Sequence, residues 1–80
     1  VNFYPNPASD KIHLNFDVSE IQEVQIDLYN INGQRVANLF SGDVQSSFDE
    51  DLNLTSVEKG VYILMINANG RIKHQKIIIE

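Results

Sequence analysis

Two histidines, His13 and His74, carry the side chains of this sequence that are best suited to proton transfer or metal binding. Each is expected on a strand, between Lys or other polar residues. Ser9 and Asp10, together with His13, supply the residue types of a hydrolase triad. They belong to one turn and the strand after it, so their side chains cannot easily line up for nucleophilic attack. We therefore interpret both histidines as exposed strand residues and predict that the chain is not an enzyme.

An acidic run, Asp49-Glu50-Asp51, is the second group of side chains that could do chemistry. On a strand, Asp49 and Asp51 point to one face and Glu50 points to the other. A calcium ion needs about six to eight oxygen ligands, so Asp43 and Asp27 would have to contribute as well. We favour the alternative, a solvated strand edge that resists the addition of another strand. Weak calcium binding at Asp49 and Asp51 stays open, and no cofactor is predicted.

The composition limits the classes of protein to which the chain can belong. Its 80 residues suffice for one domain, and 42% of them are hydrophobic, which excludes a disordered tail. The absence of cysteine excludes disulfides, thiolate metal sites and thiol nucleophiles. A net charge of −5 argues against nucleic acid and anionic membranes as partners. No apolar run approaches the ~20 residues of a membrane helix, and a start at Val1 without a signal peptide indicates a piece of a longer protein.

Polar and apolar residues alternate along most of the chain, which is typical of strands with one buried face. We expect strands at 1–4, 11–16, 23–29, 34–40 and within 44–54. The side chains expected to face the core are Ile12, Leu14, Phe16, Val24, Ile26, Leu28, Val36, Phe48, Leu52 and Leu54. For Leu39 and Phe40 the pattern leaves both faces open, because a bulge would exchange them.

Turn signals separate these strands. Ser41-Gly42-Asp43 is expected to be a loop, and Ile21 is expected to cover an edge of the core from within a polar connection. Asn32-Gly33 is typical of the tight turn of a hairpin. Thr55 and Glu58 have the spacing of a capping box, so a single helical turn is predicted there. No segment shows the periodicity of a longer helix.

The end of the chain has the pattern of a β-hairpin. Val61 to Ile66 form an unbroken apolar run, which predicts a central strand buried on both faces. Asn69-Gly70 suits a type I′ turn, after which residues 71–79 return as the second arm. That arm ends in Ile77-Ile78-Ile79. Either both faces of this apolar end are covered, or one face is kept for a partner.

Seven short candidate strands, separated by turns, predict an all-β fold. The odd number of strands and the long polar crossover before Thr55 favour an immunoglobulin-like antiparallel β-sandwich with Greek key connections over a closed barrel. A chain with these features could be a fibronectin-like accessory or adhesion module of an extracellular enzyme. Sugar binding by such a module would use exposed aromatic rings, and the absence of Trp counts against it.

Three stretches, taken together and in this order, resemble one known family. They are Tyr4-Pro5-Asn6-Pro7-Ala8-Ser9-Asp10, the stretch from Asp27 to Val36, and Lys59-Gly60-Val61-Tyr62-Ile63-Leu64 with the basic and aliphatic end that follows. Over essentially its whole length the chain resembles the type A C-terminal sorting domain of the type IX (Por) secretion system. The motif residues expected to have structural roles are Tyr4, Pro5, Asn6, Pro7, Asp10, Gly33, Gly60, Val61 and Tyr62.

The resemblance implies an address rather than a catalyst. Residues 1–80 would be a single C-terminal sorting domain, cut from a longer secreted protein of a Gram-negative bacterium and folded as an immunoglobulin-like sandwich. An outer-membrane translocon would recognise the domain in the periplasm and export the cargo domain that precedes it. A sortase of the cysteine-protease type would then remove the sorting domain at the cell surface. The cargo is expected on the surface or secreted, and the cut site is expected upstream of residue 1.

The resemblance also implies that the end of the chain contacts the translocon. The residues assigned to this contact are Lys73, Lys76, Ile77, Ile78 and Ile79. The two lysines have a simpler interpretation as edge residues that discourage aggregation. Glu80 departs from the family, whose members often end in a basic or polar residue. We expect a monomer that neither inserts into a membrane nor binds nucleic acid.

Overall fold

Seven strands follow one another along the chain in a computed structural model that describes residues 2–4 and 8–80. The strands are β1 (Asn2–Tyr4), β2 (Lys11–Asp17), β3 (Gln22–Asn30), β4 (Arg35–Val44), β5 (Ser47–Asn53), β6 (Gly60–Ala68) and β7 (Arg71–Ile79). Helices are absent from these residues, which therefore include no helix able to cross a membrane. The predicted number of strands is confirmed.

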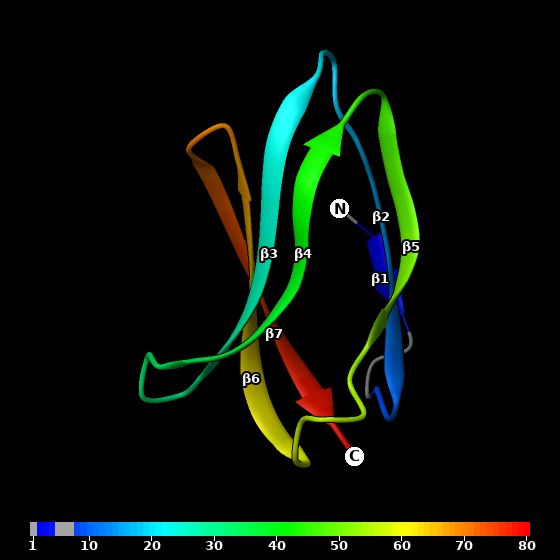
Figure 1. Cartoon of the computed structure of the whole chain (residues 1–80). Coiled ribbons are helices and arrows are strands. Elements are labelled where there is room, and N and C mark those ends of the chain that lie inside the picture. Colours follow the sequence, from blue (N-terminus) through cyan, green and yellow to red (C-terminus); the bar gives the residue numbers. More distant parts are fainter. Residues whose placement is uncertain (1, 5–7) are drawn as a thin grey trace.

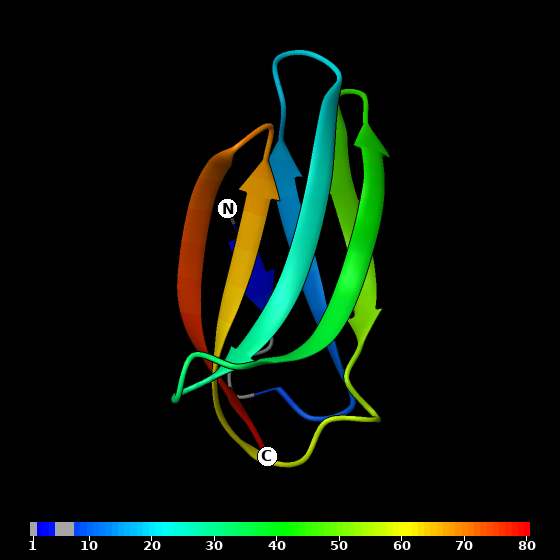
Figure 2. The ribbon, with the colours of Figure 1, turned by 60° about the vertical axis from the view of Figure 1, so that its left-hand side comes forward.

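The strands form two antiparallel sheets that lie face to face (Figure 1). The first sheet has the order β1-β2-β5, and the second has the order β4-β3-β6-β7. Figure 2 shows the second sheet in front of the first. The predicted immunoglobulin-like sandwich is thereby confirmed. Here β4 pairs with β3, whereas the fourth strand of a constant-type immunoglobulin domain joins the sheet of the first strand.

One face of each sheet builds the core between them. The side chains with less than 2% exposure and the largest volume are Ile12, Leu14, Ile26, Leu28, Leu54, Leu64, Ile77 and Val24. Phe48 stacks on Phe16 with ring centroids 5.2 Å apart and meets Phe40 edge-on at 4.8 Å. The inward residues predicted for β2, β3 and the β5 region are all buried, as a two-residue alternation predicts. Two residues depart from the alternation, since Asp27 on β3 is also buried and Glu50 on β5 is exposed.

β6 is the central strand that the sequence predicts, since it pairs with β3 on one side and β7 on the other. The prediction that both of its faces are buried is wrong. Leu64 and Ile66 are buried, whereas Val61 is 40% exposed and Ile63 and Met65 are half-buried. In a sandwich of two sheets each sheet has only one inner face, so alternate residues of even a central strand face outward.

Both predicted hairpin turns are present. Asn69 and Gly70 have φ values of 52° and 85°, as a type I′ turn requires. At the other turn only Gly33 has a positive φ, of 83°, while Asn32 does not. The Asn30 side chain orders this second turn, because its Oδ1 accepts hydrogen bonds from the backbone N–H groups of Asn32 and Gln34, each at 3.0 Å.

β4 differs from its predicted form in two ways. Ser41-Gly42-Asp43 continues the strand instead of forming a loop, and Val36 is 44% exposed instead of facing the core. The register between β3 and β4 shifts at Ile26/Asp27 and again near the turn. These irregularities break the alternation on which the prediction rested. Leu39 and Phe40, whose faces the sequence left open, are both half-buried and pack against the core.

Two smaller predictions about connections are also wrong. Ile21 does not cover the core edge, since it is 63% exposed. Thr55 does not begin a helical turn. Its N–H and its hydroxyl both donate hydrogen bonds to Asn53 Oδ1, at 2.8 Å and 2.7 Å. The preceding Asn thus orders a non-helical turn, which competes with the capping box.

Candidate recognition surface at the last strand

β7 is an edge strand of the second sheet and pairs with β6 along its whole length. The residues from Arg71 to Lys76 are all exposed. Ile77 and Ile79 are buried in the core, whereas Ile78 is 37% exposed. One face of the apolar end is therefore covered by the first sheet, and the other face lies at the surface.

The two lysines of β7 lie on opposite faces of the strand. By alternation, Lys73 shares the face of Ile77, which turns toward the first sheet, and Lys76 shares the face of Ile78, which turns away. β7 has no acidic residue, and it carries three of the six Lys and Arg residues of the chain. The last strand is thus a basic edge on a chain whose net charge is −5.

The beginning of the chain meets this edge. Tyr4 pairs with His13 in the first sheet, whereas Ala8 forms a parallel bridge to Ile79 in the second sheet. The Ala8 N–H donates to the carbonyl of Ile78 at 2.8 Å, and the Glu80 N–H donates to the carbonyl of Ala8 at 2.7 Å. Pro5, Asn6 and Pro7, motif residues with an expected structural role, lie outside the described residues. The residues on either side of them belong to different sheets.

Other motif residues support the strands around this edge. The Tyr62 hydroxyl donates to the carbonyl of Glu58 at 2.6 Å, and the ring lies against Gly60. The Asp10 carbonyl accepts from the Leu54 N–H at 2.8 Å and so holds the turn before β2 to the end of β5. Gly33 supplies the positive φ of its turn, as described above. Val61, also a motif residue, faces outward next to Ile78.

A family model described as the secretion system C-terminal sorting domain matches residues 2–80. The chain belongs to this family. None of the curated proteins and none of the solved structures compared with it gives a significant match. The resemblance seen in the sequence is confirmed, and the sorting domain is a signal for type IX secretion rather than a catalytic domain. Membership implies interaction with the type IX machinery and export of the protein to the surface or the medium.

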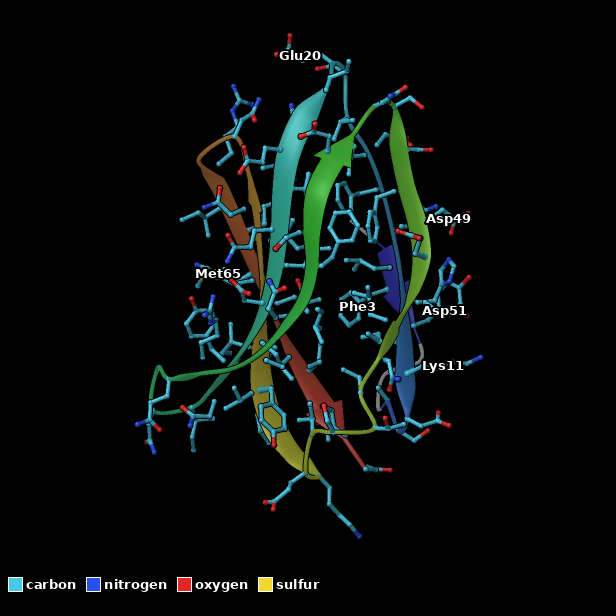
Figure 3. The ribbon with its side chains drawn as sticks, in the orientation of Figure 1. Phe3, Lys11, Glu20, Asp49, Asp51 and Met65 are labelled. Carbon is cyan, nitrogen blue, oxygen red and sulfur yellow. The ribbon has the colours of Figure 1, made fainter. Side chains whose placement is uncertain are left out.

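The first sheet of the sorting domain carries a charged cluster that sequence reasoning missed (Figure 3). His13 on β2 lies between two carboxylates of β5. Its Nδ1 is 2.7 Å from Asp51 Oδ1, and its Nε2 contacts Asp49 Oδ1. Tyr4 stacks on the imidazole with ring centroids 4.9 Å apart, and Lys11 Nζ lies 3.8 Å from Asp51 Oδ2. The missing signal was the register of β2 and β5, which places His13 opposite Asp51.

Electrostatics in this cluster favour a protonated imidazole. The hydrogen bond with Asp51, followed by that with Asp49, raises the pKa of His13 above its ordinary value of 6.5. The same hydrogen bond lowers the pKa of Asp51. The carboxylates occupy different nitrogens of one ring and do not converge on a common point. Accordingly, no group of three or more His, Cys, Asp or Glu side chains at 2–4 and 8–80 is arranged to hold a metal ion.

The remaining candidates from the sequence are dispersed. Asp27 is only 7% exposed in the second sheet, where its carboxylate accepts from Gln25 and Asn38 at 2.8 Å and lies 3.8 Å from Arg35. Asp43, on β4, is exposed. Both carboxylates belong to the second sheet, whereas the acidic run of β5 belongs to the first. The three residues of triad type near the start of the chain do not form a triad. His13 binds the β5 carboxylates, whereas Ser9 contacts Asp10.

Proposed function

We propose that this domain is the address by which an N-terminal cargo is recognised in the periplasm and carried across the outer membrane by the type IX translocon, after which a surface sortase removes the domain. The family match over residues 2–80 carries this proposal. The basic last strand, which lies at a sheet edge, supports it from the structure. In this role residues 1–80 act as one C-terminal domain, monomeric and removable, while any enzymatic activity belongs to the cargo.

The contact with the translocon is proposed to centre on β7. Lys73 and Lys76 are exposed and can meet a partner directly, as can the side chain of Ile78. Ile77 and Ile79 are buried, so their part is to anchor the strand that presents the others. Tyr62 and Gly60 act indirectly, by holding β6, against which β7 pairs.

The test is a reporter protein fused to the N-terminus of this chain in a host that has the type IX system. The fusion should reach the cell surface, and the same reporter without the domain should stay in the periplasm. Reversing both charges, with Lys73→Glu and Lys76→Glu, should reduce surface reporter without unfolding the domain, since both side chains are exposed. If the folded double variant is exported normally, the two lysines do not take part in recognition and serve only to protect the sheet edge from aggregation.

Deletion of Lys76 to Glu80 should trap the reporter in the periplasm. Because the deletion also removes two buried isoleucines, it is interpreted together with a stability measurement on the purified variant. Export of the truncated fusion would show that the end of the chain is not the signal. Absence of export for the unaltered fusion would overturn the proposed function as a whole.

A further inference from the structure

Among residues 2–4 and 8–80, part of the edge of β7 that faces away from β6 has no partner strand. In an antiparallel ladder, residues alternate between those that bond the partner strand and those whose N–H and C=O point to the other side. The carbonyl of Ile78 bonds Ala8, so it belongs to the second set. Ile72, His74 and Lys76 share its alternation, and no backbone hydrogen bond joins them to another element among residues 2–4 and 8–80. Within the described part of the chain, Ala8 thus occupies one end of this edge, and the backbone groups of Ile72, His74 and Lys76 have no partner strand on that side.

The space beside this edge is hollow. Two depressions, of about 510 Å³ and about 340 Å³, open between the sheets along β7, and Ile66 and Lys73 line both. Phe3, which Figure 3 places between the sheets, lines the smaller one. The cause is the length of β1: with three residues, it cannot cover the inner face of a nine-residue β7. The depressions form one groove with an apolar floor that includes Phe16, Leu64, Ile66 and Ala68.

Positive charge lines the β7 side of this groove. Arg71 and Lys73 alternate onto the inner face and line the larger depression, and Lys73 lines the smaller one as well. Asp17, on the far side at the end of β2, is the one carboxylate among the lining residues. A strand added to β7 would have to place side chains directly opposite Arg71 and Lys73. Opposite charges in such cross-strand positions attract and like charges repel.

We infer that the open edge of β7 binds an extended segment of the export machinery that presents carboxylates to Arg71 and Lys73 and an apolar side chain to the hollow beside Phe3. This inference rests on the proposed function and names the chemistry of the partner. Main-chain bonds to Ile72, His74 and Lys76 hold the segment, and its alternate side chains enter the groove. Lys73 disfavours extended segments that place a cation opposite it. A second copy of this chain is disfavoured as the occupant. Its own β7 would place Lys and Arg side chains opposite those of the first copy, and these like charges repel.

A direct test uses two synthetic peptides of eight residues with blocked ends, one alternating Val with Glu and the other alternating Val with Lys. The Val-Glu peptide should slow hydrogen exchange of the Ile72, His74 and Lys76 amides. Lys73→Glu should weaken its binding about tenfold or more, as expected when an attractive pair becomes repulsive. Lys59→Glu is the matched control, because Lys59 lies outside β7 and lines neither depression. Equal binding of both peptides, or an equal effect of both substitutions, would overturn the inference.

In the export assay, Lys73→Glu should lower surface reporter about tenfold, whereas Lys73→Arg, which keeps the charge, should export normally. His74→Pro should also lower export, because it removes an outward N–H while keeping the bonds to β6. Urea unfolding of each purified variant separates these effects from misfolding. Normal export of the folded Lys73→Glu and His74→Pro variants would overturn this inference alone. Failure of the unaltered domain would overturn the proposed function instead.

Discussion

At the scale of single residues, the environment of His13 is the clearest addition that the structure makes. One imidazole joins three strands, since Tyr4 stacks on it from β1 while Asp49 and Asp51 bind it from β5. Donation from both ring nitrogens requires the protonated ring. The stability of the first sheet is therefore linked to pH.

Stability should be highest in mildly acidic solution. A group whose pKa is raised on folding, such as His13, contributes stability below its ordinary value of 6.5 that is lost as the pH rises through the raised pKa. Asp51, whose pKa is lowered, contributes stability above its ordinary value of 3.8 that is lost as the pH falls through the lowered pKa. The urea concentration at the unfolding midpoint should therefore be highest between about pH 3.8 and pH 6.5, and it should decline at lower and at higher pH. His13→Gln should abolish the decline on the alkaline side, and an unchanged profile in that variant would contradict this role.

At the scale of elements, β2, β3 and β5 could be predicted because alternation alone decides the faces of a half-buried strand. β4 could not, since its register shifts depend on pairing with β3. The exposure of the outer face of β6 could not be predicted either, because an apolar run does not show whether a further layer of structure covers that face. The His13 cluster depends on pairing between residues 38 positions apart, which no local pattern encodes.

The two faces of β6 should differ in their tolerance of substitution. Leu64 is 1% exposed, so Leu64→Ala should lower the free energy of unfolding by about 2–5 kcal/mol. Ile63 is half-buried on the outer face, and Ile63→Ala should cost clearly less. Denaturant titration of both variants makes the comparison. Equal losses would mean that the outer face of β6 is covered.

At the scale of the whole molecule, charge is distributed unevenly between the two sheets. Asp49 and Asp51 of β5 flank His13 in the first sheet, whereas β7 carries Arg and Lys residues and no acidic residue. The molecule thus presents a basic edge despite its overall negative charge. A partner guided by charge would approach the β7 side, where the open backbone and the groove also lie.

Removal of Ile77 to Glu80 should unfold much of the domain. It deletes two buried isoleucines and the bridge to Ala8. Loss of one buried isoleucine side chain costs about 2–5 kcal/mol, against a total stability of roughly 4–12 kcal/mol for a chain of this length. Thermal unfolding followed by circular dichroism should show a much lower midpoint. Ile78→Ala is the control and should melt near the unaltered protein, whereas a cooperative transition near that temperature in the truncated chain would contradict the prediction.

The bridge between Ala8 and β7 also affects when the domain can fold during synthesis. A chain that is synthesised and translocated from its N-terminus presents Ala8 early, but the partner of Ala8 emerges only with the final residues. The central strand β6 and the core residues Ile77 and Ile79 arrive equally late. The sandwich therefore cannot close until residues 77–79 have been synthesised. A product terminated before Ile77 would lack a finished domain, so the fold itself distinguishes chains that contain this strand from chains that do not.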